Sequence, residues 1–252
     1  ETDSADLYIN LEKETGISTG VKQNGSLTVA LTKDRHEEIL RQASMAKAFG
    51  VDVNEISISE LKSFHPFLNV DDVKGAVHLP LDGQGDPANI AMALAKGARD
   101  LGVKIYEDTK VTGLNTYNNS VSGVHWINEN EKGFIKTENA ANCAGMWARD
   151  FAEDQGVTVP LHACEHFYIV TEPVKDLSTL PVLRMPDEQT YYKEDAGKFL
   201  VGAFELEAKP WGMDGIDENF CFDQLPEDLD HFEPILEKAI NRIPILEKYG
   251  IQ

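Results

Sequence analysis

The segment Ala140–Ala148, near the middle of the chain, has the pattern of a buried strand that runs through a small-residue turn into a helix. Its turn residues, Ala144 and Gly145, have almost no side chain, so a flat or charged ligand could lie directly on their backbone. The N–H groups of the following helix would face an anion placed there, and the helix dipole would favour its charge. A plain strand-to-helix corner is the alternative interpretation. The segment therefore predicts α/β structure and a candidate ligand-binding turn.

The composition is that of an ordinary globular protein, with 42% hydrophobic and 26% charged residues in a chain of 252. This length can bury a full core as one large domain or as two smaller ones. A net charge of −20 disfavours nucleic acid and anionic membrane surfaces, because a phosphate backbone needs clustered lysine and arginine. The longest apolar stretches are strand-sized, whereas a membrane span needs roughly 20 residues. We therefore expect neither a nucleic acid nor a membrane as partner.

The cysteines Cys143, Cys164 and Cys221 are odd in number and far apart, and no Cys-x-x-Cys pair occurs. This pattern argues against a disulfide framework or a zinc site and favours a reducing compartment. We therefore expect a cytoplasmic location and assign no metal site.

Hydrophobic periodicity and turn residues predict a mixed order of strands and helices. Strands are expected at 26–31, 75–79, 103–106, 110–114, 121–127, 134–137, 140–143, 162–171, 190–193 and 199–204, and helices at about 34–50, 57–65, 87–101, 146–155 and 229–242. The first helix is expected to start at Thr32 or Asp34 as its cap. Ser57-Ile58-Ser59-Glu60 has the capping-box pattern, and Asp86-Pro87 suits the start of a helix. The strands 110–114, 121–127 and 134–137 are expected to form a three-stranded meander.

A series of short motifs carries a family resemblance. They include Asp82-Gly83, Val111-Thr112-Gly113-Leu114, Asn142-Cys143-Ala144-Gly145-Met146-Trp147-Ala148, Glu165-His166-Phe167-Tyr168, Tyr191-Tyr192-Lys193-Glu194 and Gly202-Ala203-Phe204-Glu205. In this order, and over nearly the whole chain, the sequence resembles the FAD-dependent amine oxidase and dehydrogenase family, which is D-amino acid oxidase-like, and most of all its dimethylglycine/sarcosine dehydrogenase branch. The resemblance implies an FAD enzyme that oxidises N-methyl amines such as dimethylglycine or sarcosine by hydride transfer to the flavin.

The resemblance also implies a fold, an FAD-linked reductase-like α/β (α+β) fold in truncated form, in which FAD-side and mixed-sheet substrate domains interleave. Residues 1–84 and 159–252 would form the substrate-binding part, and 85–158 part of the FAD-binding domain. Relatives begin with a strand, a Gly-x-Gly-x-x-Gly turn and a helix that bind the ADP half of FAD. Gly83-Gln84-Gly85 lacks the third glycine of that motif. We therefore expect an internal fragment of a longer flavoprotein, which alone binds FAD weakly or not at all and is inactive.

The candidate catalytic residues also follow from the resemblance. His166 matches a histidine that faces the substrate near the flavin, and Tyr191 matches a tyrosine of the substrate pocket. A histidine can hold the substrate or accept a proton near neutral pH. Tyr191 and Tyr192 are adjacent on a predicted strand, so only one of them can face the pocket. A structural role is the alternative for both His166 and Tyr191.

The candidate cofactor-binding residues are Val111, Ala144, Gly145 and Trp147. Val111 matches a residue whose backbone meets the adenine, and the other three match the segment along the pyrophosphate and ribityl chain. For Trp147, anchoring the helix to the sheet is the alternative.

The implied partners are a small methylamine substrate and an electron acceptor, either oxygen or an electron-transfer protein. The segment 87–158 lacks the parallel strands on which it should pack, and such an open edge would be relieved by a longer chain or by a homo-oligomer. The mitochondrial matrix is the alternative location. Two other classes stay open, namely a non-catalytic regulatory paralogue of the same fold and a small-molecule binding domain without redox activity.

Overall fold

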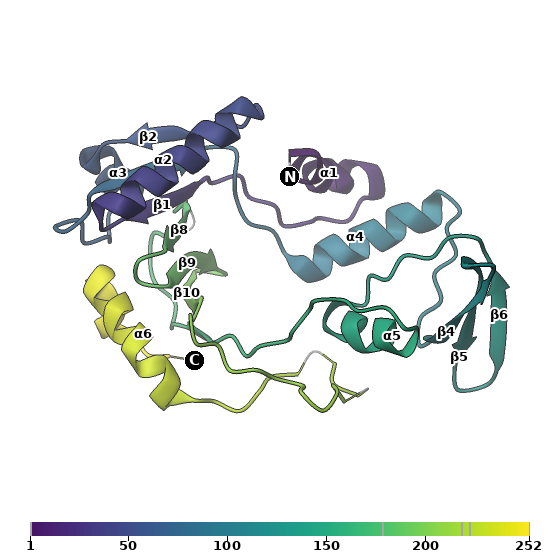
Figure 1. Cartoon of the computed structure of the whole chain (residues 1–252). Coiled ribbons are helices and arrows are strands. Elements are labelled where there is room, and N and C mark those ends of the chain that lie inside the picture. Colours follow the sequence, from purple (N-terminus) through teal and green to yellow (C-terminus); the bar gives the residue numbers. More distant parts are fainter. Residues whose placement is uncertain (1, 178, 218, 222, 252) are drawn as a thin grey trace. The chain divides into compact units, whose positions relative to one another are not determined.

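The computed structural model describes residues 2–177, 179–217, 219–221 and 223–251, and the chain divides into two compact units (Figure 1). Unit 1 comprises Glu1–Leu101, His166–Glu207 and Pro226–Gln252, and unit 2 comprises Gly102–Glu165 and Ala208–Leu225. Each unit is therefore assembled from segments that are distant in the sequence. The predicted domain boundaries at 84 and 158 stay a prediction.

Unit 1 is built on a seven-stranded mixed sheet with the strand order β2-β3-β1-β8-β9-β10-β7. Its strands are β1 (Ser26–Ala30), β2 (Asn54–Ile56), β3 (Gly75–Leu79), β7 (Tyr168–Val170), β8 (Val182–Met185), β9 (Thr190–Asp195) and β10 (Lys198–Ala203). β1 pairs with β8 in parallel, so strands from the N-terminal and C-terminal segments lie in one sheet. The remaining pairs in this sheet are antiparallel.

The helices of unit 1 are α1 (Thr2–Thr15), α2 (Lys33–Ala48), α3 (Ile58–Phe64), α4 (Pro87–Asp100), α6 (Leu229–Arg242) and the 3₁₀ helix η2 (Pro244–Lys248). Three of them, α2, α3 and α4, begin where the sequence predicts caps. Thr32 is the N-cap of α2, and Asp86 is the N-cap of α4 with Pro87 as its first residue. Ser57 and Glu60 form the predicted capping box at the start of α3.

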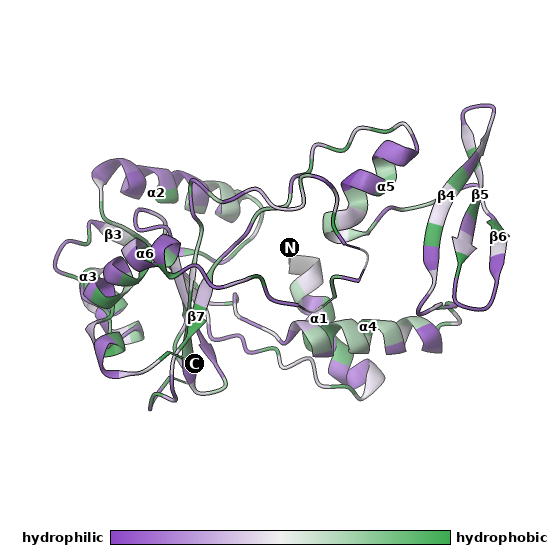
Figure 2. Cartoon of the chain, turned by 90° about the horizontal axis from the view of Figure 1, so that it is seen from below, coloured by the Kyte–Doolittle hydropathy of each residue, from purple (hydrophilic) through white to green (hydrophobic). Residues whose placement is uncertain are grey.

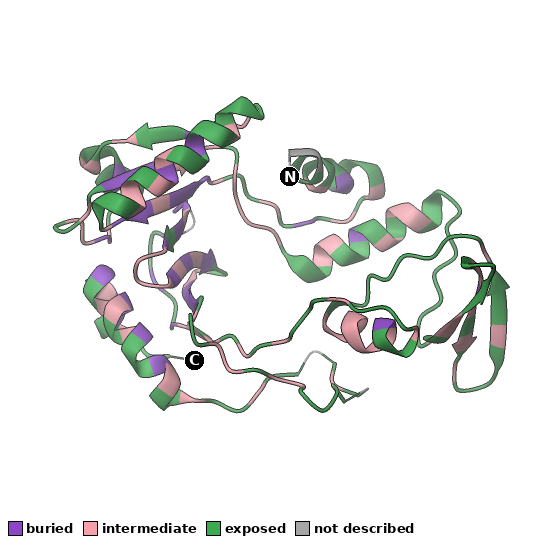
Figure 3. Cartoon of the chain, in the orientation of Figure 1, coloured by how far each residue is buried: buried purple, intermediate pink, exposed green. Residues whose placement is uncertain are grey.

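The sheet of unit 1 is covered differently on its two faces. On one face, residues of α3, α6 and η2 pack against the strands in the main core, which contains Leu27, Val29, Leu61, Leu183, Met185, Tyr192, Phe199, Val201, Ala239, Ile243 and Leu246. On the other face, α2 packs on β1, β2 and β3 around Ile39 and Val77. Figure 3 shows the buried residues of unit 1 gathered in these strands and along α2 and α6. The second face is more open towards β9, β10 and β7, where Tyr168 is 52% exposed.

Unit 2 contains the predicted three-stranded antiparallel meander. Its elements are β4 (Lys110–Tyr117), β5 (Ser120–Ile127), β6 (Lys132–Lys136), the 3₁₀ helix η1 (Gly145–Trp147) and α5 (Ala148–Asp154). Asn118 and Asn119 connect β4 to β5 with positive φ angles of 50° and 60°, the backbone that a tight hairpin turn requires. Hydrophobic and hydrophilic residues are interspersed along these strands (Figure 2).

Two predicted strands of unit 2 are wrong. The segments 103–106 and 140–143 are irregular, and their residues are exposed, with Val103 at 54% and Ile105 at 38%. Their apolar composition suits a strand, but a strand is stabilised by pairing, and neither segment forms a ladder with another strand among the described residues. The predicted strand 162–171 is also shorter than expected. Only β7 is regular there, and Cys164 forms an isolated bridge with Pro210 within unit 2.

Candidate active site

The register of the C-terminal strands aligns three residues across the open face of the unit 1 sheet. Gly202 of β10 lies opposite Tyr168 of β7 on one side and opposite Tyr191 of β9 on the other. Because side chains alternate along a strand, Tyr192 points to the opposite face and is 1% exposed in the core. Of the two adjacent tyrosines, Tyr191 is therefore the one that is available to a ligand.

The ring of Tyr191 lies close over Gly202 of β10, because Gly202 has no side chain. A Cβ atom at Gly202 would be 2.1 Å from Cζ of Tyr191 and 2.3 Å from its hydroxyl oxygen. Burial raises the pKa of Tyr191 above its ordinary value, and the nearby Tyr168 and Glu205 act in the same direction. The hydroxyl therefore stays protonated at neutral pH and can donate a hydrogen bond.

Phe204 brings the two candidate catalytic residues together. Its ring centroid lies 5.1 Å from that of Tyr191 and 6.3 Å from that of His166. The N–H of Ala203 donates to the carbonyl of Phe167 over 3.1 Å, so strand pairing continues past β7 and brings His166 beside Phe204. With Phe204 61% exposed, these rings form an open surface. We call the four residues His166, Tyr168, Tyr191 and Phe204 the aromatic face.

Glu205 anchors the imidazole of His166. Its Oε2 lies 3.0 Å from Nδ1 of His166, and its Oε1 accepts a 3.2 Å hydrogen bond from the N–H of Phe167. The side chain of Glu205 is only 4% exposed, whereas that of His166 is 56% exposed. Sequence reasoning gave no role to Glu205. The available signal was its place at the end of the Gly202-Ala203-Phe204-Glu205 motif, where an acid directly follows a buried strand.

The four candidate cofactor-binding residues all lie in unit 2. Val111 of β4 is 42% exposed, and the register of β4 shifts directly after it. Ala144 and Gly145 are exposed, and Trp147 is partly buried. Gly145 has a φ of 55°, and no atom lies within 4 Å of the position that a Cβ would occupy. The open space above the backbone of Gly145 fits contact with an extended cofactor such as FAD.

The turn itself is shaped by Asn142. Its Oδ1 accepts a hydrogen bond from the N–H of Ala144 over 3.2 Å, and its Nδ2 donates to the carbonyl of Ala148 over 2.9 Å. The helix that was expected to follow directly is instead the 3₁₀ helix η1 and then the seven-residue α5. The predicted helix 146–155 is therefore present in two parts, and its α-helical part begins at Ala148 rather than directly at the turn.

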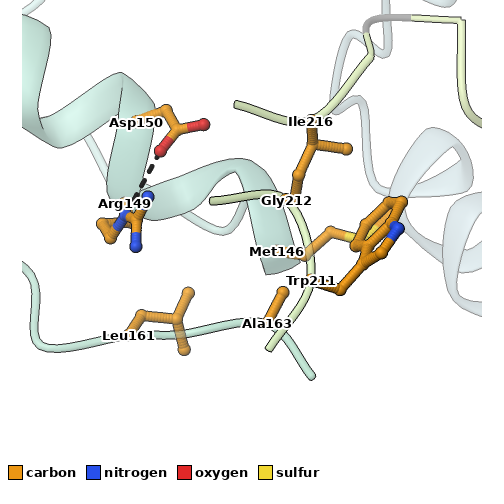
Figure 4. Close-up of a pocket in the computed structure, with 8 residues that line it drawn as sticks. All are labelled: Met146, Arg149, Asp150, Leu161, Ala163, Trp211, Gly212 and Ile216. Carbon is orange, nitrogen blue, oxygen red and sulfur yellow. Dashed lines mark hydrogen bonds and ion pairs between the residues drawn. The ribbon is translucent and has the colours of Figure 1, made fainter. Parts of the chain in front are cut away.

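A small cavity lies beside η1 and α5. It has a volume of about 10 Å³ and is lined by Met146, Arg149, Asp150, Leu161, Ala163, Trp211, Gly212 and Ile216 (Figure 4). Trp211 also packs on Phe220, with 4.7 Å between ring centroids. A space of this size holds no more than about one water molecule, so it is a packing gap rather than a substrate pocket.

The glycines near residue 84 serve packing. A Cβ at Gly83 would lie 2.0 Å from the carbonyl oxygen of Lys22, and one at Gly85 would lie 2.8 Å from Cδ1 of Ile90. Both glycines allow close approach of protein segments, in agreement with the interpretation that this motif is not a dinucleotide fingerprint. Within the described residues, no group of three or more His, Cys, Asp or Glu side chains could hold a metal ion. No helix in that part of the chain is long and apolar enough to cross a membrane.

Comparison with known proteins decides the family. The family model described as FAD dependent oxidoreductase (DAO) matches residues 1–251. The chain belongs to the FAD-dependent oxidoreductase family. The cofactor of this family is FAD, and the mixed α/β structure agrees with that of its members.

The sequence is similar to several curated proteins. The chain is 37% identical to the mitochondrial sarcosine dehydrogenase of Homo sapiens, over 96% of this chain and 26% of that protein. It is 38% identical to the mitochondrial pyruvate dehydrogenase phosphatase regulatory subunit of Mus musculus, over 97% of this chain and 28% of that protein. It is 30% identical to the mitochondrial dimethylglycine dehydrogenase of Rattus norvegicus, over 99% of this chain and 30% of that protein. The chain therefore spans less than a third of these curated relatives. The crystal structure of L-proline dehydrogenase from P. horikoshii is 25% identical with a TM-score of 0.81, covering 100% of this chain and 63% of that one.

Proposed function

We propose that this chain is part of an FAD-dependent dehydrogenase or oxidase of small N-methyl amines, with sarcosine and dimethylglycine as the first candidate substrates. The observation that carries the proposal is the aromatic face of unit 1, where His166, held by the buried Glu205, and Tyr191 both contact Phe204. The similarity to a sarcosine dehydrogenase and a dimethylglycine dehydrogenase supports the choice of substrate class.

The aromatic face suits a methylated amine. Bound FAD supplies the electron-accepting ring that takes a hydride equivalent from an N-methyl carbon. The rings of Tyr168, Tyr191 and Phe204 offer apolar surface to methyl groups and attract an ammonium through their electron-rich faces. The protonated hydroxyl of Tyr191 can donate a hydrogen bond to the carboxylate of an amino-acid substrate.

The amine must also lose a proton. An ammonium nitrogen has no lone pair with which to assist departure of a hydride, so a neutral amine is the reactive form. His166 is the side chain of the aromatic face that can accept a proton near neutral pH, and its 56% exposure leaves it accessible to a ligand. Val111, Ala144, Gly145 and Trp147 would hold FAD, chiefly through their backbone.

The remaining partners follow from this chemistry. The electrons must leave the flavin for oxygen or for an electron-transfer protein. The names of the similar dehydrogenases favour the mitochondrial matrix over the cytoplasm as location. The exposed apolar segments 103–106 and 140–143 would gain strand partners from further chain or from a second copy.

A regulatory protein without redox activity is the second candidate. The 38% identity to a phosphatase regulatory subunit favours it, because that relative is as similar to this chain as the sarcosine dehydrogenase is. The two candidates differ in one measurable property, which is the reduction of bound flavin by an amine.

Anaerobic mixing of the full-length flavoprotein with sarcosine or dimethylglycine tests the proposal. We expect the flavin absorbance to bleach, and we expect His166→Ala to slow bleaching by roughly 10²-fold or more, the scale of a positioned acid–base group. The flavin content should not change, because His166 is placed on the substrate side. A flavin-loaded protein that no N-methyl amine bleaches would contradict the proposal and support the regulatory alternative.

A further inference from the structure

Glu205 is a buried acid with two defined partners. Its side chain is 4% exposed, and it lies between the backbone of Phe167 and the ring of His166. A buried carboxylate is costly unless its oxygens accept hydrogen bonds, so both contacts contribute to keeping it in place. These two partners together determine how the proton of His166 is arranged.

The backbone contact fixes the role of one oxygen. The N–H of Phe167 can only donate, so Oε1 of Glu205 must accept. The other oxygen, Oε2, faces Nδ1 of His166 at 3.0 Å. An ionised carboxylate has no proton to offer, so this second contact requires a hydrogen on Nδ1. A neutral His166 therefore carries its proton on Nδ1, and Nε2 has a free lone pair. Nε2 makes no hydrogen bond within the described part of the chain.

We propose that Glu205 is a positioning residue that keeps Nδ1 of His166 protonated and thereby makes Nε2 the acceptor of the substrate ammonium proton. This inference rests on the proposed function. In this step the N–H bond of the ammonium breaks, and its electron pair stays on the nitrogen as the lone pair of the neutral amine. The proton forms a new bond to Nε2, and the resulting imidazolium is stabilised by the carboxylate of Glu205. No oxidant or reductant takes part in the step.

Glu205→Gln tests the arrangement because glutamine has the same shape but a different hydrogen-bonding pattern. The N–H of Phe167 still requires an acceptor, so the amide oxygen must face it and the amide NH₂ must face His166. Nδ1 would then have to accept, which moves the ring proton to Nε2. The variant therefore reverses the tautomer with little change in volume.

The first readout is the tautomer itself. Nitrogen-15 chemical shifts of labelled histidine distinguish a protonated ring nitrogen from an unprotonated one, and loss of a signal in His166→Gln assigns the residue. We expect Nδ1–H in the wild-type protein and Nε2–H in Glu205→Gln. Glu207→Gln, which removes the same charge from an exposed neighbour, is the matched control and should keep the wild-type tautomer. A wild-type Nε2–H tautomer at His166 would overturn the proposal even if Glu205→Gln does not fold.

The second readout is anaerobic flavin reduction by the amine in the full-length flavoprotein. We expect Glu205→Gln to slow it by about 10²- to 10⁴-fold at unchanged flavin content, with Glu207→Gln at the wild-type rate. A reversed tautomer with undiminished reduction would overturn the role of Nε2 while leaving the amine oxidase function intact. A wild-type flavoprotein that no amine reduces would instead overturn the proposed function, and with it the proton transfer, whatever tautomer is found.

Discussion

We expect Gly202→Ala to change the shape of the candidate active site while it lowers the stability of unit 1 only slightly. The new methyl carbon would lie 2.1 Å from Cζ of Tyr191, whereas carbon atoms pack at about 3.5–4.0 Å. The ring of Tyr191 must therefore move by roughly 1.5 Å or more. Because it lies on the open face of the sheet, it can swing away from β10 without displacing the core.

The expected free-energy change follows from two opposing effects. Crowding by an added methyl group costs about 1–3 kcal/mol, and replacing a strand glycine by alanine returns about 0.5–1 kcal/mol. Since the ring can move towards solvent, we expect a net loss of unfolding free energy of about 1 kcal/mol, near the lower end of that range. The larger effect should be on amine binding. Displacement of the Tyr191 hydroxyl should raise KM for the amine about tenfold, equivalent to about 1.4 kcal/mol.

Denaturant unfolding, amine kinetics and a spectrophotometric titration of tyrosine measure the outcome of Gly202→Ala. Burial is the first cause of the raised pKa of Tyr191, so the displaced ring should titrate closer to the ordinary value. Gly97→Ala in α4 is the control, because its added methyl would meet Thr15 at an ordinary 3.4 Å. It should stabilise the protein by about 0.5–1 kcal/mol and leave the amine kinetics unchanged. An unchanged KM and tyrosine titration in Gly202→Ala would refute the placement of Tyr191 in the site.

Two further predictions concern buried ionisable side chains. Arg242, whose side chain is 4% exposed, pairs with Glu188 at 2.7 Å, and we expect Arg242→Met to lower the unfolding free energy in denaturant by about 3–5 kcal/mol. Arg35→Met, which removes a side chain that is 31% exposed, should cost only about 1 kcal/mol, and equal losses would contradict the argument. Burial lowers the pKa of His65 from 6.5 to about 4, so the folded state binds fewer protons than the unfolded state between these values. Stability should therefore fall by up to about 3 kcal/mol as the pH drops through this window, and His65→Phe should remove that slope in pH-dependent unfolding.

The sequence predicted those features of the fold that depend on residues close together in the chain. The caps of α2, α3 and α4 depend on residues three positions apart, and the structure has all three. Four elements of unit 1 were not predicted, namely α1, β2, β8 and η2. For α1 and β8 the reason is that their stability is tertiary. Among the residues of α1 whose burial is described, only Leu11 is buried, and the helix packs against α4. Strand β8 has four residues between prolines, too few to show a period, and is held by β1 and β9 on its two sides.

The segments 103–106 and 140–143 were predicted as strands but are irregular in the structure. Both have the composition of buried strands, yet a strand needs hydrogen-bonding partners along its edge, and composition says nothing of where these come from. In unit 2 neither segment has such a partner among the described residues, and both are irregular. Sequence reasoning had recognised that parallel strands were missing beside this region, but it still assigned strands there.

For the candidate site, the sequence supplied residues but not their arrangement. His166 and Tyr191 followed from the family resemblance, and their roles stay proposals. Their common contact with Phe204 depends on the register of β7, β9 and β10, which one sequence does not determine. Glu205 was missed because an acid after a strand usually lies in solvent, and only the fold reveals that it is buried.

The burial of Glu205 also bears on the choice between an enzyme and a regulatory protein. A carboxylate kept for structure alone would be satisfied by backbone donors, such as the N–H of Phe167, and by a fully buried cation. Glu205 instead directs its second oxygen to a histidine that is more than half exposed, on a face of aromatic rings. Because solvent screens the exposed imidazole of His166, its pairing with Glu205 contributes little to folding, so folding alone does not account for the arrangement. Ligand binding at the aromatic face accounts for the arrangement. A ligand there would meet the unprotonated Nε2 of His166, because Glu205 keeps the ring proton on Nδ1.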